Sequence, residues 1–473
     1  MIEIKDCFVN EFTEIISRYI LQFFDTRGKL RVVSEEIENK ELVSIEFLED
    51  GLQVVRFFPT IGDRGISSPF YCQIGVYSGE SGKKPAENVL RELLKVSEFG
   101  IKNGVYAKQR DYGKGASRQL SYKKRSLDLA FELGICSWLT ATGAEACTLH
   151  TIISQMINWA GRTYEGKNVP FGIVIDFGEE RSSNKASYIH FLENDCSAVF
   201  SDGIFSGILL DKKGSLISFI TRKSNEDSSS QFETFVPYQF SDIAEHCIKR
   251  RIGIIVLTNG EIILIKDRAI CFAKRGTKWV YFDWSKVYSK LRPYFMLIQE
   301  PDEAVIRKNI KAIYCTLLDV SFSHTGGCLA LVIDNEDIEN VIKDRFDLSI
   351  QGKAPKGISK ENKEKIEILK YLLENEDHKV RAFFDIEKPL RREILSLDGA
   401  TVLSLDGSFY CAGSIVAVPG GSSGGGRTAA AKKLAEFGVG IKVSEDGYIE
   451  AYAKPTNGEN AAHTRIIQLF KIK

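Results

Sequence analysis

The sequence predicts an α/β fold of the α+β kind, with two tandem modules that are each a mixed sheet flanked by helices, plus an N-terminal α/β region. Two observations carry this prediction. Three segments recur in the same order along the chain, and repeated order is the sequence signature of a duplicated architecture. The length of 473 residues, with 44% hydrophobic and 27% charged residues, suits a globular protein of two or three domains.

The recurring segments have matching patterns. The first pair joins a helical stretch to a glycine and an apolar run that ends in Val-Ile-Asp. The second pair is a hairpin signature, Asp-Gly followed by two strands around a glycine turn. The third pair is a helix, a glycine, a strand, an Asn-Gly or Asp-Gly turn and another strand. The pairs are 164–177 with 323–335, 200–219 with 395–413, and 242–267 with 429–454.

These repeats divide the chain into three regions. Residues 1–124 fit neither copy and are expected to form the N-terminal α/β region. Residues 125–290 form the first module, in which the motifs described below are degenerate. Residues 291–473 form the second module, which retains them.

Composition limits the classes of partner. Lysine plus arginine number 63 and aspartate plus glutamate number 63, so the zero net charge gives no support for a nucleic-acid or anionic-membrane partner. No apolar run approaches the length that spans a bilayer. The ten scattered cysteines, without a C-x-x-C pair, are typical of reduced thiols, and the first residues lack a signal-peptide pattern. We therefore expect a cytoplasmic protein with neither membrane nor nucleic acid as a partner.

A glycine-rich stretch, "GGSSGGGRT" at 420–428, precedes a helix-forming segment. Backbone N–H groups at a helix N-terminus favour anions, and one arginine would add a charged donor. The stretch has neither the Walker nor the dinucleotide-binding glycine spacing. Phosphate binding and a plain flexible loop both remain open from this pattern alone.

Two carboxylates lie in predicted turns of the second module. Asp398 begins a hairpin strand, and Glu445 precedes an Asp-Gly turn at the end of another strand. Magnesium is usually held by one or two carboxylates, with water and phosphate as the other ligands. Both residues could equally be ordinary turn formers, and their spacing does not separate the two interpretations.

The ordered set "DGA", "GGR-T" and "VSEDG-I" resembles the diadenylate cyclase (DAC) domain, which folds as a mixed sheet flanked by helices and joins two ATP molecules into cyclic di-AMP. The resemblance covers about 291–473, with a weaker echo in 125–290. The whole tandem is similar to the DAC-like family DACNV, described as sensors linked to prokaryotic conflict systems. It implies a role in antiphage defence or stress signalling.

The resemblance implies a site. Asp398 and Glu445 match the metal-binding carboxylates, for Mg²⁺ or Mn²⁺ when the ligand is a triphosphate. The positions that match nucleotide-binding residues are Asp398, Gly399, Ala400, Gly424, Gly425, Gly426, Arg427, Thr428, Ser444 and Glu445.

Two departures bear on activity. Thr428 and Ala429 stand where the family has a histidine and a second arginine. Hydrogen bonds to charged groups contribute roughly 1.5–3 kcal/mol each, so losing two would slow turnover by roughly 10²–10⁴. In the first module, Asp202 matches Asp398, but Thr258 stands in place of Glu445 and the glycine loop is missing.

The sequence thus favours a sensor that binds an adenine nucleotide or a cyclic dinucleotide, acting as a homo-oligomer or with an effector protein. As an enzyme it would be a weak or inactive cyclase homologue. The alternatives are an active cyclase that makes cyclic di-AMP, in which Asp398 and Glu445 would be catalytic, and an interaction scaffold without a ligand.

Overall fold

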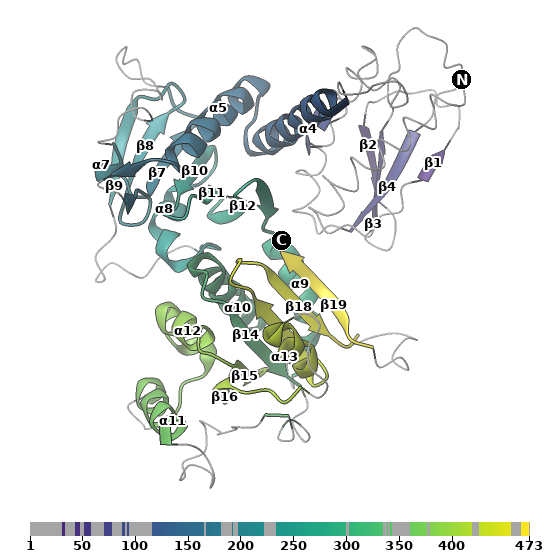
Figure 1. Cartoon of the computed structure of the whole chain (residues 1–473), viewed down its shortest axis with the longest axis vertical. Helices are drawn as coiled ribbons and strands as arrows, with labels where there is room; N and C mark the ends of the chain where they lie inside the picture. Colours follow the sequence, from purple (N-terminus) through teal and green to yellow (C-terminus); the bar gives the residue numbers. More distant parts are fainter. Residues whose placement is uncertain are drawn as a thin grey trace. The chain divides into compact units, whose positions relative to one another are not determined.

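A computed structural model shows a chain of helices and mixed sheets (Figure 1). The residues that it describes are 31–33, 43–47, 52–57, 71–77, 88–89, 92–93, 116–164, 167–180, 192, 197–221, 233–298, 302–333, 338, 341–342, 360–375, 379–418, 425–455 and 465–472. Contacts divide the chain into two compact units. Unit 1 comprises Met1–Phe232 and Asp242–Asp283, and unit 2 comprises Glu233–Ser241 and Trp284–Lys473.

The N-terminal region contributes a small antiparallel sheet in the order β1-β4-β3-β2. Val, Ile, Phe and Tyr dominate its strands, as expected for pleated structure. The strands are β1 (Arg31–Val33), β2 (Val43–Phe47), β3 (Leu52–Phe57) and β4 (Tyr71–Tyr77).

Unit 1 contains a seven-stranded sheet in the order β13-β12-β11-β10-β7-β8-β9. Two helices precede the central strand β7, which is buried along its whole length. The elements are α4 (Ala116–Leu139), α5 (Gly143–Trp159), β5 (Thr163–Tyr164), β6 (Lys167–Asn168), β7 (Phe171–Asp176), α7 (Ser197–Phe200), β8 (Ser206–Asp211), β9 (Leu216–Thr221), α8 (Ser241–His246), β10 (Arg251–Val256), β11 (Ile262–Lys266), β12 (Ala269–Arg275) and β13 (Lys278–Tyr281).

Unit 2 contains a six-stranded sheet in the order β16-β15-β14-β17-β18-β19. Two long helices again precede the fully buried central strand, here β14. The elements are the short helix η3 (Tyr238–Phe240), α9 (Trp284–Phe295), α10 (Glu303–Ser323), β14 (Gly327–Val332), α11 (Lys360–Leu373), η5 (Phe383–Asp385), α12 (Lys388–Leu395), β15 (Ala400–Ser404), β16 (Phe409–Ser414), α13 (Gly426–Leu434), β17 (Gly438–Val443), β18 (Ile449–Ala453) and β19 (Ile467–Ile472).

The two sheets share one topology over six strands, and β13 of unit 1 has no counterpart in the sheet of unit 2. In each, the central strand pairs in parallel with the next strand of the chain and antiparallel with a later strand, and the other pairs are antiparallel. Glycines with positive φ occupy matching turns, where a side chain would be strained. The matching glycines are Gly203 with Gly399, Gly214 with Gly407, and Gly260 with Gly447. The predicted fold class is therefore confirmed, and the common topology agrees with a duplication.

Helices cover both faces of the sheet in unit 2. Alternate residues of β14, Cys328 and Ala330 among them, share a core cluster with Ala431 and Leu434 of α13. The opposite face of β14 meets α12, because a Cβ on Gly327 would lie 2.5 Å from the carbonyl oxygen of Leu395. The sheet thus forms a middle layer, and its strand ends stay open to other groups.

The segment Glu233–Ser241 follows β9 in the chain but belongs to unit 2. The Tyr238 backbone N–H donates to Oδ1 of Asp319 on α10 over 2.5 Å, and the Phe235 ring lies 4.7 Å from that of Trp284. Burial raises the pKa of Asp319 to about 7, although the Tyr238 N–H lowers it. This buried carboxyl therefore fastens the segment to α10.

Among the described residues, no helix is both long and apolar enough to cross a membrane.

Candidate functional site

Strand register brings the predicted site residues of unit 2 to one edge of its sheet. Gly327 pairs with Val443 on β17, and Leu329 pairs with Thr401 on β15. Continuing the β14–β17 register by one residue and the β14–β15 register by three places Ser444 and Asp398 on either side of Gly326. Their backbones are then two strand spacings apart, roughly 10 Å.

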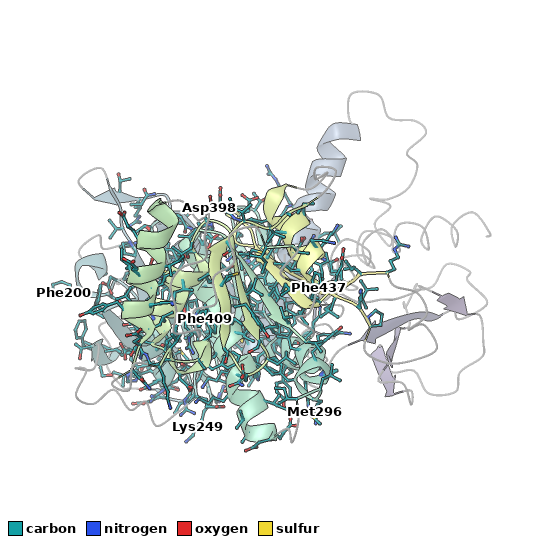
Figure 2. The ribbon with its side chains drawn as sticks, turned by 90° about the horizontal axis from the view of Figure 1, so that it is seen from below. Phe200, Lys249, Met296, Asp398, Phe409 and Phe437 are labelled. Atoms are coloured by element: carbon teal, nitrogen blue, oxygen red, sulfur yellow. The ribbon has the colours of Figure 1, made fainter. Side chains whose placement is uncertain are left out.

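The conformation of the Asp398–Ala400 turn follows from its local contacts. Asp398 is exposed, and Ala400 is buried as the first residue of β15 (Figure 2). Between them, Gly399 has φ of 103°, and a Cβ there would lie 2.6 Å from the carbonyl carbon of Gly413. The close approach of β16 therefore requires glycine, and the turn leaves the Asp398 carboxylate facing solvent.

Among the described residues, nothing closes off the N-terminus of α13. Gly425 caps the helix with φ of 83°, and a Cβ on Gly425 or Gly426 would meet nothing within 4 Å. Free N–H groups at such an end can bind an anion. Gly424 and the rest of the glycine-rich stretch before it lie outside the described residues.

Arg427 joins this helix end to the carboxylate edge. Its Nη1 lies 2.8 Å from Oε1 of Glu445. Its guanidinium also lies against Gly326, where a Cβ would come within 2.7 Å of Nη1. Because the two side chains are 38% and 70% exposed, water screens the pair, and a ligand can compete for either charge.

His324 and Ser444 shape the loops at this edge. His324 ends α10 in the left-handed region, and its Nδ1 lies 2.7 Å from the carbonyl oxygen of Glu445. The Ser444 hydroxyl accepts from the Tyr448 N–H over 3.1 Å and so takes part in the β17–β18 turn. The resemblance implies Ser444 as a nucleotide contact, which stays a prediction; in this structure its hydroxyl takes part in the turn that presents Glu445.

Lys442, which the sequence did not single out, also lies beside the candidate site. Its Nζ donates to Oγ1 of Thr428 over 2.7 Å and lies 3.1 Å from Oε2 of Glu450. Lys471 and the Tyr452 hydroxyl also contact Glu450. Burial alone would raise the pKa of Glu450, but these hydrogen bonds outweigh it and lower the pKa to about 2. The only sequence signal for Lys442 is its position three residues before Glu445.

The donor set can be tested for a metal ion. Within the described residues, no three His, Cys, Asp or Glu side chains gather into a ready-made metal site. Asp398 and Glu445 supply two carboxylates at one sheet edge, which suits Mg²⁺ when phosphate and water complete its coordination. Both carboxylates are exposed, so phosphate oxygens could reach a metal held between them.

The matching edge of unit 1 is built differently. Oδ1 of Asp202 accepts backbone N–H groups from Ile204, Phe205 and Ser206 over 2.7–3.0 Å, so this carboxylate forms the turn itself. The helix α8, which corresponds to α13, has six residues and no glycine-rich approach. This arrangement agrees with the degenerate first module that the sequence predicts.

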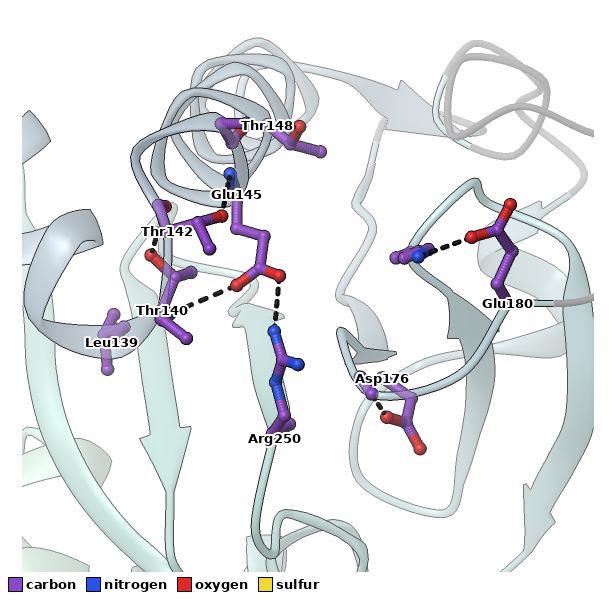
Figure 3. A network of polar contacts seen from close by, with 12 residues as sticks. Leu139, Thr140, Thr142, Glu145, Thr148, Asp176, Glu180 and Arg250 are labelled. Carbon is purple, nitrogen blue, oxygen red and sulfur yellow. Dashed lines mark hydrogen bonds and ion pairs between the residues drawn. The ribbon is translucent and has the colours of Figure 1, made fainter.

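A further polar cluster of unit 1 is paired internally (Figure 3). Glu145 binds the guanidinium of Arg250, and its N–H donates to Oγ1 of Thr142, the N-cap of α5. Asp176 accepts from the Gly178 N–H over 2.8 Å and lies 2.7 Å from Nε of Arg251. These contacts stabilise helix and strand ends and offer no evident chemistry.

Comparison of the sequence with models of known protein families gave no match, and comparison with curated proteins gave none either.

Proposed function

We propose that unit 2 binds an adenine nucleotide or a cyclic dinucleotide, and that the protein is a sensor of the DAC-like kind. The observation that carries this proposal is the meeting of Asp398, the open N-terminus of α13, and the Arg427–Glu445 pair at one sheet edge. These groups offer carboxylates for a metal, N–H donors for phosphate and one guanidinium.

Ligand binding would change the partners of Arg427 and Glu445 at this edge. Arg427 can leave the solvent-screened Glu445 and bind phosphate, which frees Glu445 to join Asp398 on a metal ion. A bound Mg²⁺ or Mn²⁺ would supply charge neutralisation for a triphosphate. Thr428 and Ala429 provide no charged side chain of their own toward a leaving pyrophosphate, so the proposal is occupancy rather than efficient turnover.

Calorimetric titration with ATP, cyclic di-AMP and related dinucleotides tests the proposal. We expect at least one ligand to bind, and Arg427→Ala to weaken it by about 1.5–3 kcal/mol because a charge-assisted hydrogen bond is lost. Lys433→Ala is the matched control, since Lys433 lies in the last turn of the same helix and pairs with Glu436. Absence of binding at millimolar nucleotide would favour a scaffold without a ligand.

A further inference from the structure

Lys442 lies where a cation can act on the ligand of this site. Gly440 of β17 touches α13 so closely that a Cβ would lie 1.9 Å from the Ala431 carbonyl oxygen. Side chains alternate along a strand, so Lys442 is on the same face as Gly440, two residues further along. There its Nζ reaches Thr428, in the first turn of α13.

The positive charge of Lys442 is not fully neutralised by the residues that it contacts. Glu450 is shared between Lys442 and Lys471, so two ammonium groups face one carboxylate. The side chains of Lys442 and Glu450 are only 17% and 10% exposed, which holds the ammonium in place with little screening. An excess of positive charge is thus fixed beside α13.

The position of this charge is unfavourable without a ligand. Helix N-termini carry partial positive charge and favour anions, and cations are favoured at the opposite end. The first turn of α13 nevertheless contains no acidic residue and has Arg427 and Lys442 beside it. Glu445, which offsets Arg427, is 70% exposed and therefore a weak counter-charge. An anion bound at this helix end would neutralise part of this positive charge.

On this basis, and resting on the proposed function, we propose that Lys442 is a second phosphate-binding cation of the site. Successive helical residues point roughly 100° apart. The guanidinium of Arg427 and the ammonium of Lys442, which contacts Thr428, therefore lie on different sides of the first turn. Two cations beside one helical turn can each bind a different phosphate of a polyphosphate chain. The ligand class that fits is a linear nucleoside polyphosphate, in preference to a cyclic dinucleotide with two separate phosphodiesters.

The test compares inorganic tripolyphosphate, ATP and cyclic di-AMP on the full chain by calorimetry. We expect Lys442→Met to weaken tripolyphosphate and ATP at least tenfold, Lys442→Arg to retain most of the affinity, and cyclic di-AMP to bind more weakly than ATP. Lys432→Met is the control, because Lys432 lies in the last turn of α13, over the Tyr452 ring, and should leave the affinity unchanged. Thr428→Val removes the hydroxyl that Lys442 contacts without altering the Glu450 network, and should also weaken tripolyphosphate.

The outcomes separate the two proposals. If ATP binds but neither Lys442→Met nor Thr428→Val weakens tripolyphosphate, the role of Lys442 is overturned and the proposed function stands. If tripolyphosphate binds through Lys442 but no adenine nucleotide adds affinity, the nucleotide proposal fails and Lys442 is upheld. If the wild-type chain binds none of the three, both proposals fail.

Discussion

The residues of the site differ in how strongly their surroundings constrain them. Gly399 and Gly326 are required by close contacts, with a neighbouring strand and with a guanidinium respectively. Asp398 and Glu445 are exposed, and no packing requirement fixes their side chains. The packing of the fold therefore leaves both carboxylates available for the proposed role in binding.

Asp319 gives a prediction at this scale. Its pKa is raised by burial from the model-compound value of 3.8 to about 7, so the folded chain binds more protons than the unfolded chain between these pH values. The free energy of unfolding should therefore fall as pH rises from about 4 to 7 and level off above that. Lys388, Arg391 and Arg392 also act on this carboxyl and limit the rise.

Urea denaturation of wild type and Asp319→Asn across this range measures the effect. The amide oxygen can still accept from the Tyr238 N–H, so the variant should gain stability relative to wild type as pH rises from about 4 to 7, and this advantage should be absent near pH 4. Glu393→Gln, at an exposed position of α12, serves as the control. A stability difference that does not vary with pH would show that Asp319 is ionised throughout.

At the scale of elements, the contact of α13 with β17 positions both cations of the site. Gly440→Ala should destabilise the chain by about 1–3 kcal/mol, because its Cβ would meet a backbone oxygen that side-chain rotation cannot move. We also expect it to weaken nucleotide binding, since α13 must shift. Urea denaturation and calorimetry measure the two effects.

Gly143→Ala is the matched control for that substitution. Gly143 is the first residue of α5, and a Cβ there meets nothing within 4 Å. Alanine is the better helix former, so this variant should be as stable as wild type or slightly more stable. If Gly440→Ala behaves like Gly143→Ala, α13 does not depend on this close approach.

Elements were predictable from sequence where the pattern is local. Apolar runs marked β7 and β14, and Asp-Gly turns marked the hairpins, because turn chemistry and periodicity act over a few residues. The contact of Lys442 with Thr428 depends on which residue of β17 lies under α13. Nothing within either segment encodes that register, so the second cation of the site required the structure. The structure was likewise needed to show that the Ser444 hydroxyl accepts a hydrogen bond within the β17–β18 turn.

At the scale of the whole molecule, the two modules share a topology but differ in their edges. The DAC-like proposal implies that synthesis of cyclic di-AMP requires two nucleotide sites facing each other. Unit 1 uses Asp202 within its own turn and has no glycine-rich approach to α8. Within the described residues, one chain therefore offers one candidate site, in unit 2.

Purified protein given ATP with Mg²⁺ or Mn²⁺ should consequently make little or no cyclic di-AMP. Product formation is followed by mass spectrometry over hours, with Asp398→Asn as the blank. Conversion that disappears in Asp398→Asn would make the protein an enzyme. Thr428→His combined with Ala429→Arg should then raise activity if these positions limit it.

The segment Glu233–Ser241 limits where the chain can be cut without separating residues of one compact unit. A fragment beginning at Trp284 would contain the whole second sheet but would lack Phe235, which packs on Trp284, and the N–H that Asp319 binds. A fragment that keeps this segment must carry α8 and β10–β13 with it, since they lie between in the chain. The two compact units, unlike the tandem repeats, are therefore interlaced in sequence, so a single crossover in the gene that exchanges all of unit 2 also replaces part of unit 1.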